Sequence, residues 1–441
     1  MTLGVVLGAG FSKAVDAAFP LVDELGELVR GLVPEAMSSA PPRFLGGSFE
    51  RWLSRIAEPQ PDLDDVANLA NARDFARVTS AIHRVMVSIE ATVFAGDIPW
   101  WLLRLVRILH ELRATVVTFN YDTLVEAAAA RVLRYGQHGV LNTDSLTDGI
   151  PPTPPVPGQY GPVTVETFRL LKLHGSLDTY WVPGDAAGTS ILRAAGSIWA
   201  PGAGIADQGA RIARNAPGRV PFIVPPASAK SAFFANPITR QLWQTARERL
   251  AQCDEIAVLG YSMPMTDLVA TAMIVEAQKV SGAHVSIVNP SPEPVSRTLC
   301  AGGVDAAGVS VAAESCEGYV DELERRLSAA ALKKLKVALG DARPLVVAGA
   351  GTVLPVIALR EAGSAIHLEV GAHEQEVQLR DTSTWIASSA LLHALERTGA
   401  RHVTVTVEGE TAHVLGCVLP VSHLTDFLVL DPSAVRPANR S

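Results

Sequence analysis

The 441-residue chain contains few cysteines, few charged residues and no long uninterrupted apolar run. No two of its cysteines form a CxxC pair, which excludes a disulfide scaffold and a four-thiolate zinc ribbon. They are Cys253, Cys300, Cys316 and Cys417. The most apolar stretch, residues 100–119, is interrupted by several charged side chains, so we expect no membrane-spanning helix. The first residues lack the cationic start of a signal peptide, and we expect a cytoplasmic protein.

The charge balance is mildly acidic. Lysines and arginines number 37 against 45 aspartates and glutamates, which gives a net charge of −8. This sign argues against direct nucleic-acid binding through bulk charge. Charged residues make up 19% of the chain and the mean hydropathy is +0.23, so wholesale disorder is excluded. A chain of this length is expected to divide into two or three domains.

Short apolar runs rich in β-branched residues recur along the first three quarters of the chain and predict buried strands. They occupy residues 2–7, 114–119, 169–173, 222–224, 255–259 and 284–288. Between about 21 and 112 the apolar spacing is helical, and a further helix is predicted over 236–252. Strands that alternate with helices predict an α/β fold with a Rossmann-like, mostly parallel sheet and a helical insertion.

The chain is predicted to divide near residue 340. An amphipathic helix predicted over about 319–339 ends near Gly340. We therefore expect a first domain over 1–330 and a small C-terminal α/β or α+β domain over 341–441, with a regulatory or assembly role.

The remaining segments are assigned by their composition. The prolines of 149–162 predict an exposed loop, and the Gly/Ala-rich segment 184–219 predicts a long surface excursion. Within 344–370 the pattern predicts a strand, a glycine loop, a helix and a strand, and it predicts another helix at 385–399.

A glycine turn follows the first predicted strand. Gly8-Ala9-Gly10 and Ser12 open a helix there, and such a turn can bind a pyrophosphate through backbone N–H groups. The dinucleotide fingerprint, however, requires a third glycine where this chain has Lys13. A second strand bearing a ribose-binding acid is also missing, which disfavours an ordinary Rossmann dehydrogenase. A tight turn without a ligand remains the alternative.

Four more predicted strands end in small or polar residues. These ends are Asn120-Tyr121-Asp122, His174-Gly175-Ser176, Gly260-Tyr261-Ser262 with Asp267 downstream, and Asn289-Pro290. The carboxyl ends of parallel strands share one edge of a sheet, which is where open α/β sheets bind ligands. We therefore expect the five strand ends to converge on one site.

The motifs GAGFS, TFNYDTL, KLHGS, FIVPP, VLGYSMPMTD and VNPSP, in that order, resemble the SIR2-like domain of bacterial anti-phage NAD⁺-cleaving effectors. The resemblance covers about residues 1–330. True sirtuin deacylases carry a zinc ribbon with four cysteine ligands after the catalytic histidine, whereas residues 175–250 contain no cysteine here. The resemblance thus implies a Rossmann-like NAD⁺ site without a metal, and it leaves the acyl-lysine machinery in doubt.

The resemblance also implies residue roles. Asn120 would bind the nicotinamide ribose and help to hold a water, and His174 would act as the base. The NAD⁺ phosphates would contact Gly8, Ala9, Gly10 and Ser12. The adenosine half would contact Gly260, Ser262 and Asn289. Asp122 and Asp267 are included among the NAD⁺-binding residues because of their positions after the strands. Each could instead simply cap the helix that follows it.

The resulting hypothesis is an NAD⁺ glycohydrolase that depletes NAD⁺ in antiviral abortive infection. Histidine, with an ordinary pKa of about 6.5, suits the role of base. Two alternatives stay open: a protein deacylase or ADP-ribosyltransferase, and a non-catalytic sensor of NAD⁺ or ADP-ribose. A depleting enzyme must be silent in healthy cells. We therefore expect activation by a second copy of the chain, an ATPase, an Argonaute-like protein or a nucleotide signal.

Overall fold

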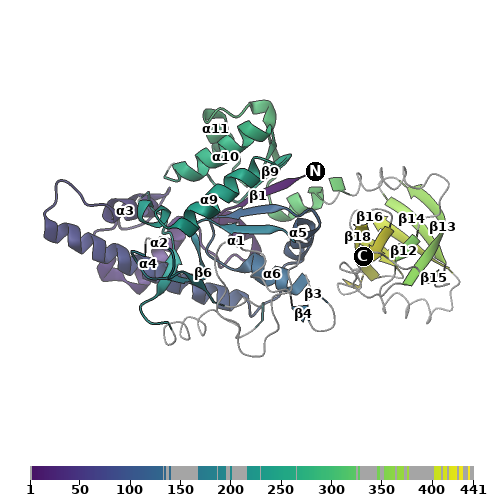
Figure 1. Cartoon of the computed structure of the whole chain (residues 1–441), viewed down its shortest axis with the longest axis horizontal. Helices are drawn as coiled ribbons and strands as arrows, with labels where there is room; N and C mark the ends of the chain where they lie inside the picture. Colours follow the sequence, from purple (N-terminus) through teal and green to yellow (C-terminus); the bar gives the residue numbers. More distant parts are fainter. Residues whose placement is uncertain are drawn as a thin grey trace. The chain divides into compact units, whose positions relative to one another are not determined.

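The computed structural model describes most of the first 327 residues and the strands of the C-terminal part. The described residues are 2–132, 134–135, 139–140, 167–185, 187–194, 199–200, 216–228, 230–264, 266–323, 326–327, 345–347, 352–362, 365–371, 375–376, 402–408, 411–414, 417–424, 427–430 and 436–437. The chain folds as two units (Figure 1). Unit 1 comprises Met1–Arg134 and Gly139–Tyr319, and unit 2 comprises Tyr135–His138 and Val320–Ser441.

Unit 1 is built on a six-stranded sheet with every neighbouring pair parallel. Its strands are β1 (Leu3–Leu7), β2 (Thr115–Thr118), β5 (Arg169–Lys172), β9 (Glu255–Leu259), β10 (His284–Val288) and β11 (Val309–Ala313). All residues of β1, β2 and β9 are buried, as expected of parallel strands covered on both faces. The predicted α/β fold with a mostly parallel, Rossmann-like sheet is confirmed.

The strand order across this sheet is β11-β10-β9-β1-β2-β5. The chain runs outward from β1 through β2 to β5, and then returns to β9 on the other side of β1 and continues to β11. The direction of winding therefore reverses between β1 and β9. In open α/β sheets, such a reversal leaves a crevice at the carboxyl ends of the strands, where ligands bind.

Two details of the strand prediction were wrong. The segment 222–224 does form part of a strand, β8 (Val220–Ile223), but it lies outside the main sheet. It pairs antiparallel with β6 (Gly175–Trp181) in a separate sheet ordered β7-β6-β8, where β7 is Leu192–Arg193. The edge strand β11 was missed because its residues are half-buried or exposed, which removes the continuous apolar run.

The helical insertion after β1 is confirmed. Its elements are α1 (Ala9–Val15), α2 (Val22–Leu32), η1 (Pro34–Met37), α3 (Ser48–Ala57), α4 (Asp65–Val93) and α5 (Trp100–Glu111). Helices α2, α3 and α4 pack together as a group (Figure 1). Phe49 of α3 stacks on Trp52 and meets Phe44 edge-on, which fills the space between these helices. The Asp64 side chain caps α4 by accepting from the Ala67 N–H at 2.7 Å.

The remaining helices of unit 1 follow β2. They are α6 (Leu124–Val132) after β2, followed later by α8 (Ser231–Phe234), α9 (Pro237–Leu250), α10 (Leu268–Ser281), α11 (Glu293–Ala301) and η3 (Ala306–Gly308). The predicted helix over 236–252 is α9, which packs on β2 and β5. The Asn236 carboxamide oxygen accepts from the Ile238 N–H at 2.9 Å and caps α9. In Figure 1, α9, α10 and α11 lie next to one another.

Apart from the helical residues 320–323 and 326–327, the described part of unit 2 consists of strands. They are β12 (Leu345–Val347), β13 (Thr352–Ala362), β14 (Ala365–Gly371), β15 (Gln375–Glu376), β16 (His402–Glu408), β17 (Thr411–Val414), β18 (Cys417–Leu424), β19 (Phe427–Leu430) and β20 (Arg436–Pro437). They form one nine-stranded sheet. Residues Arg134–Tyr135 (β3) and Gly139–Val140 (β4) form a separate two-stranded sheet.

The helix predicted within 344–370 was wrong, because that segment is strand β13. It pairs antiparallel with β14 from Val356 to Ala362, so cross-strand pairing overrides its helix-forming alanines and leucine. The helix predicted at 385–399 and the loop predicted at 149–162 lie outside the described residues. Within the described ranges, no helix combines the length and the apolar character needed to cross a membrane.

Candidate active site

The five strand ends singled out in the sequence meet along the carboxyl edge of the main sheet. Backbone hydrogen bonds carry the pairing one step beyond the strands. The Phe119 N–H donates to Leu7 O at 3.1 Å, and the Leu173 N–H donates to Thr118 O at 3.0 Å. On the other side of β1, the Gly260 N–H donates to Val288 O at 2.9 Å. The residues that follow each strand therefore start from the same level of the sheet.

The glycine turns after β1 and β9 are packed directly against each other. The Gly10 N–H donates to Gly260 O at 2.9 Å, and the Gly8 N–H donates to Leu259 O at 3.1 Å. Gly260 has φ +62°, and a Cβ there would lie 2.2 Å from the Phe11 nitrogen. The glycines thus allow two backbones to touch at the switch point of the sheet. The backbone amides of Gly8 and Gly10, in the predicted phosphate-binding turn, thus donate to carbonyl groups at the end of β9 and just after it. Ala9, between them, is the exposed residue of this turn.

A first polar cluster joins the turn after β1 to the turn after β2. The Asn120 amide nitrogen donates to Gly8 O at 2.8 Å and to Ser12 Oγ at 2.9 Å. Ser12 Oγ in turn donates to Asp122 Oδ2 at 2.6 Å. Ser12 and Asp122 are buried, whereas Asn120 is half-buried. Asp122 Oδ1 lies 3.4 Å from the Leu124 nitrogen, so the stronger hydrogen bond of this carboxylate is the one from Ser12 and not the one from the helix that follows.

A second cluster surrounds His174, which follows β5. Lys230 Nζ donates to Asp267 Oδ1 at 2.8 Å and lies 3.5 Å from His174 Nε2. Tyr261 Oη donates to Asp267 Oδ2 at 2.8 Å. All four residues are buried. Asp267 occupies the N-cap position of α10, but its side chain makes no cap hydrogen bond and serves this cluster instead.

The electrostatics of the second cluster keep His174 uncharged. Burial and the nearby Lys230 ammonium lower the pKa of His174 to about 3, against an opposing effect of Asp267. Burial raises the pKa of Asp267, but the neighbouring His174, the Lys230 ammonium and the Tyr261 hydroxyl together lower that pKa overall. At neutral pH the cluster therefore holds a neutral imidazole beside an ammonium–carboxylate pair.

Aromatic rings connect the two clusters. The Phe119 ring lies 4.9 Å from the His174 ring and 4.6 Å from the Tyr261 ring, and Phe119 directly precedes Asn120. The ring centres of Trp243, on α9, and His174 lie 6.2 Å apart. These rings exclude water from the imidazole, which accounts for the burial that lowers its pKa.

The residues predicted to bind the adenosine half lie farther along the edge and closer to solvent. Ser262 is exposed, and Gly260 and Asn289 are half-buried. Asn289 Oδ1 accepts from the Ser291 N–H at 2.9 Å and so stabilises the turn after β10. The predicted set is thus layered. Ala9 and Ser262 are exposed, and Gly10, Gly260 and the two asparagines are half-buried. The buried members are Gly8, Ser12, Asp122, His174 and Asp267.

Sequence reasoning missed Lys230. It follows β8 in the segment FIVPPASAK, whose strand was predicted but assigned to the wrong sheet. The available signal was a polar residue after a predicted strand, the same feature that marks the other strand ends. Only the three-dimensional fold brings the separate sheet of β6, β7 and β8 against His174.

Buried charges support the turn after β2 from below. Lys172 Nζ donates to the backbone oxygen of Asp122 and to Glu126 Oε1, the latter at 2.9 Å. Glu90 Oε2, which belongs to the helical insertion, accepts from the Thr123 N–H at 2.6 Å. Burial raises the pKa of Glu90 to about 8. The backbone that carries Asn120 is thereby held by side chains from β5, α4 and α6.

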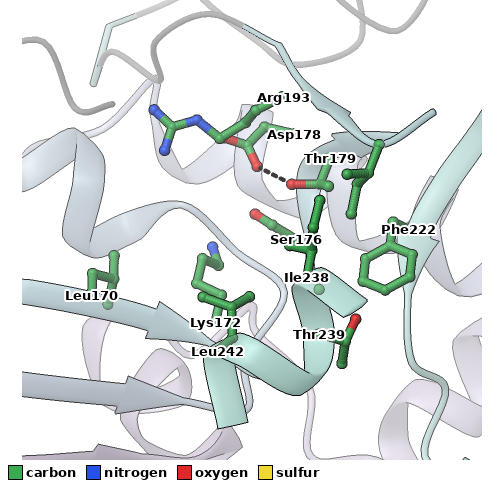
Figure 2. Close-up of a pocket in the computed structure, with 12 residues that line it drawn as sticks. Leu170, Lys172, Ser176, Asp178, Thr179, Arg193, Phe222, Ile238, Thr239 and Leu242 are labelled. Carbon is green, nitrogen blue, oxygen red and sulfur yellow. Dashed lines mark hydrogen bonds and ion pairs between the residues drawn. The ribbon is translucent and has the colours of Figure 1, made fainter. Parts of the chain in front are cut away.

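Figure 2 shows a cavity bounded by β5, β6 and α9. Its volume of about 10 Å³ has room for about one water molecule. Lys172, Ser176, Asp178 and Arg193 line it together with apolar side chains. Arg193 Nε lies 3.7 Å from Asp178 Oδ2. None of the predicted site residues lines this cavity, which is far too small for a dinucleotide.

No group of three or more His, Cys, Asp or Glu side chains in the described ranges is placed to hold a metal ion. The polar groups of the candidate site are instead amides, hydroxyls, an imidazole, an ammonium and two carboxylates, Asp122 and Asp267, each of which accepts from another side chain. These groups suit hydrogen bonding and proton transfer.

Comparison with known proteins shows a distant likeness to Sir2 structures. A serine-to-alanine mutant of a Sir2 homologue bound to ADP-ribose matches with a TM-score of 0.37 and 15% identity over 75% of this chain and 92% of that one. Sir2 with the inhibitor EX-527, 2′-O-acetyl-ADP-ribose and deacetylated p53 peptide matches with 0.34 and 12%, over 75% and 93%. Sir2 with p53 peptide and NAD⁺ matches with 0.34 and 13%, over 75% and 94%.

At these TM-scores the likeness carries no argument about what this chain binds. No protein-family model matches the chain. No curated protein matches it either.

Proposed function

We propose that the chain is an NAD⁺ glycohydrolase that releases nicotinamide and leaves ADP-ribose or a cyclic form of it. The observation that carries the proposal is the joint placement of Asn120 and His174. Asn120 follows β2 and His174 follows the neighbouring strand β5, both at the carboxyl edge of the main sheet. The winding of this sheet reverses between β1 and β9, and β1 is the other neighbour of β2. The ordered strand-end motifs that resemble SIR2-like NAD⁺-cleaving domains support the same conclusion.

Asn120 suits the reacting end of the substrate. Both hydrogens of its amide nitrogen are committed, to Gly8 O and Ser12 Oγ. Its Oδ1 is therefore the atom that the amide offers to a ribose hydroxyl or a water. A neutral oxygen near the anomeric carbon stabilises an oxocarbenium-like centre without forming a covalent bond to it.

His174 suits the role of proton acceptor because it is neutral at physiological pH. Its low pKa makes it a weak base in the arrangement described, and catalysis by it requires the proton to be taken as charge develops on the substrate. The diphosphate is assigned to the turn of Gly8, Ala9, Gly10 and Ser12. The adenosine half is assigned to Gly260, Ser262 and Asn289, with Asp122 and Asp267 as supporting residues.

We further propose that the activity depletes NAD⁺ in antiviral defence and is gated. Residues 341–441 are assigned a regulatory or assembly role, with a second copy, an ATPase, an Argonaute-like protein or a nucleotide signal as activator. A change from about 1% to 99% active molecules requires about 5.5 kcal/mol of differential binding to the active state. A protein interface of ordinary size or a tightly bound nucleotide supplies this amount.

The burial of His174 favours one alternative, a non-catalytic sensor of NAD⁺ or ADP-ribose. A sensor requires binding without turnover, and a buried, weakly basic imidazole is compatible with that. Deacylation is disfavoured by the absence of cysteine from 175–250, whereas ADP-ribosyl transfer stays open. Nicotinamide release in the absence of any acyl-peptide or acceptor protein separates these activities from hydrolysis.

The deciding experiment is an NAD⁺ cleavage assay on the purified full-length chain at several protein concentrations, with nicotinamide measured by chromatography. Asn120→Ala is expected to abolish cleavage, and His174→Ala is expected to reduce it by about 10²–10⁴-fold. His284→Ala is the matched control, because His284 is exposed at the start of β10. Binding of NAD⁺ without cleavage at any concentration would favour the sensor, and wild-type turnover by Asn120→Ala would refute the site.

A further inference from the structure

Lys230 is a buried cation beside the candidate base that the proposed reaction has not used. Its side chain is 5% exposed, and its ammonium is held by Asp267 at 2.8 Å. The ion pair with Asp267 explains how the Lys230 charge can be buried. It does not explain why Lys230 Nζ also lies 3.5 Å from His174 Nε2. Lys230 lies in the segment between β8 and α8, so a separate sheet delivers it to the edge of the main one.

The chemistry of the two groups determines which atom donates. An ammonium has three hydrogens and no lone pair, so it can only donate a hydrogen bond. His174 Nε2 must then be the accepting, unprotonated nitrogen, and the single proton of the neutral ring lies on Nδ1. Asp267 Oδ2 is 3.8 Å from Nε2, too far for a hydrogen bond, so the carboxylate does not compete for a proton there.

We propose that Lys230 is a positioning residue for His174: the ammonium, held by Asp267, keeps the imidazole in the tautomer whose Nε2 is unprotonated. The lone pair of Nε2 is thereby reserved for a hydrogen-bond donor. In the chain by itself that donor is Lys230. The role of this tautomer in turnover rests on the proposed function, in which a ribose hydroxyl displaces the ammonium from Nε2.

The other ionisable groups around His174 fit this assignment. Tyr261, after β9, donates to Asp267 and so leaves one carboxylate oxygen for Lys230. Glu50 of α3 is buried near Lys230 and Asp267, and burial raises the pKa of its carboxyl group. The remaining neighbours, Phe119 and Trp243, are uncharged rings. Lys230 therefore supplies the positive charge that opposes protonation of the imidazole, in line with its lowered pKa.

The tautomer can be observed directly. Long-range ¹H–¹⁵N correlation spectra of the full-length chain, labelled on histidine ring nitrogens, distinguish protonated from unprotonated nitrogens. Comparison with His174→Gln identifies the signals of His174. The wild type is expected to show a protonated Nδ1 and an unprotonated Nε2 from pH 5 to pH 8. A protonated Nε2 in the wild type would overturn the proposal.

Substitution of Lys230 gives the second arm. In Lys230→Met the His174 signals are expected to show a mixture of tautomers, and the pH at which they titrate is expected to rise. Lys230→Arg retains a donor and is expected to retain the wild-type tautomer. Lys279→Met is the matched control, because Lys279 is exposed and donates to Gly302 O. Spectra of Lys230→Met that match the wild type at every pH would refute the proposal.

A third variant guards against loss of the fold. Lys230→Met leaves the Asp267 charge buried with one partner fewer, which is destabilising. The double variant Lys230→Met/Asp267→Asn replaces the ion pair with neutral groups of similar size and keeps an oxygen that can accept from Tyr261. It is expected to show the same loss of tautomer preference as Lys230→Met, and retention of the wild-type tautomer would count against Lys230.

Kinetics separate this inference from the proposed function. A residue that acts through His174 is expected to lower kcat of NAD⁺ cleavage at least tenfold with less than a threefold change in KM. The same substitution is expected to have no further effect in His174→Ala. If the wild type fails to cleave NAD⁺ while the spectra behave as expected, the proposed function fails and the assignment of Lys230 stands. If cleavage occurs but Lys230→Met has the wild-type tautomer, the assignment of Lys230 fails alone.

Discussion

Glu90 offers a direct test of the electrostatics beneath the candidate site. It is 2% exposed on α4, and Oε2 of its carboxyl group accepts from the Thr123 N–H at 2.6 Å. Burial raises its pKa from 4.5 to about 8. The folded chain therefore retains a proton that the unfolded chain releases above pH 4.5. Stability is lost as pH rises from 4.5 to 8, by about 1.4 kcal/mol per pH unit.

Glu90→Gln removes this loss because an amide cannot ionise, and its oxygen can still accept from Thr123. Relative to the wild type, the variant is expected to gain about 0.7 kcal/mol of unfolding free energy at pH 5 and about 3 kcal/mol at pH 7. Unfolding in urea at pH 5, 6, 7 and 8, followed by tryptophan fluorescence, measures this gain. Trp385 is the one tryptophan of seven that falls outside unit 1, so the signal reports mainly on unit 1.

His174 also makes the unfolding free energy depend on pH, in the opposite direction to Glu90. Subtracting the wild-type value from that of the variant removes this contribution. Its pKa is lowered in the folded chain, so the unfolded chain binds a proton first and stability falls as pH drops below 6.5. This contribution is common to both proteins and cancels. Glu248→Gln, which makes the same substitution on the exposed face of α9, is the matched control. A gain from Glu90→Gln that is equal at pH 5 and pH 8 would refute the reasoning.

Three further predictions concern the glycine turns, the Ser12 network and the domain boundary. Gly260→Ala should destabilise unit 1 by more than about 2 kcal/mol in urea unfolding, because its Cβ would lie 2.2 Å from the Phe11 nitrogen; an unchanged midpoint would contradict the packing of the two turns. Ser12→Ala should cost about 1–3 kcal/mol and reduce NAD⁺ cleavage at least tenfold, since it removes the donor to Asp122 and the acceptor of Asn120; full activity would refute that network. A chain ending at residue 340 should remain folded and bind NAD⁺ by calorimetry, and an insoluble product would refute the domain boundary.

The fold of unit 1 could be predicted from the sequence where burial on both faces leaves a continuous apolar run, as in β1, β2 and β9. The same signal cannot say which strands are neighbours. It therefore identified the strand at 222–224 but not its separate antiparallel sheet. An edge strand such as β11 gives little signal, since only one side of it is covered.

The candidate site was predictable in part for a geometric reason: parallel strands deliver their carboxyl ends to one edge. This placed Asn120 and His174 near each other without knowledge of any contact. The Lys230–Asp267 pair was not predictable, because it joins a loop of the small sheet to the N-cap of α10 across 37 residues. The pKa of His174 depends on that pair and on the surrounding rings, and so could not be derived from sequence either.

The central position of β1 has a consequence for how the chain is made. One neighbour, β2, follows within about 120 residues, but the other, β9, is synthesised about 250 residues after it. At about 5–20 residues per second, β1 waits about 12–50 s on the ribosome with one edge unpaired. The turn at Gly8 and Gly10 is completed only when Gly260 arrives, so a nascent or prematurely terminated chain has no assembled site. Under the proposed function, this order of synthesis would leave unfinished chains unable to cleave NAD⁺.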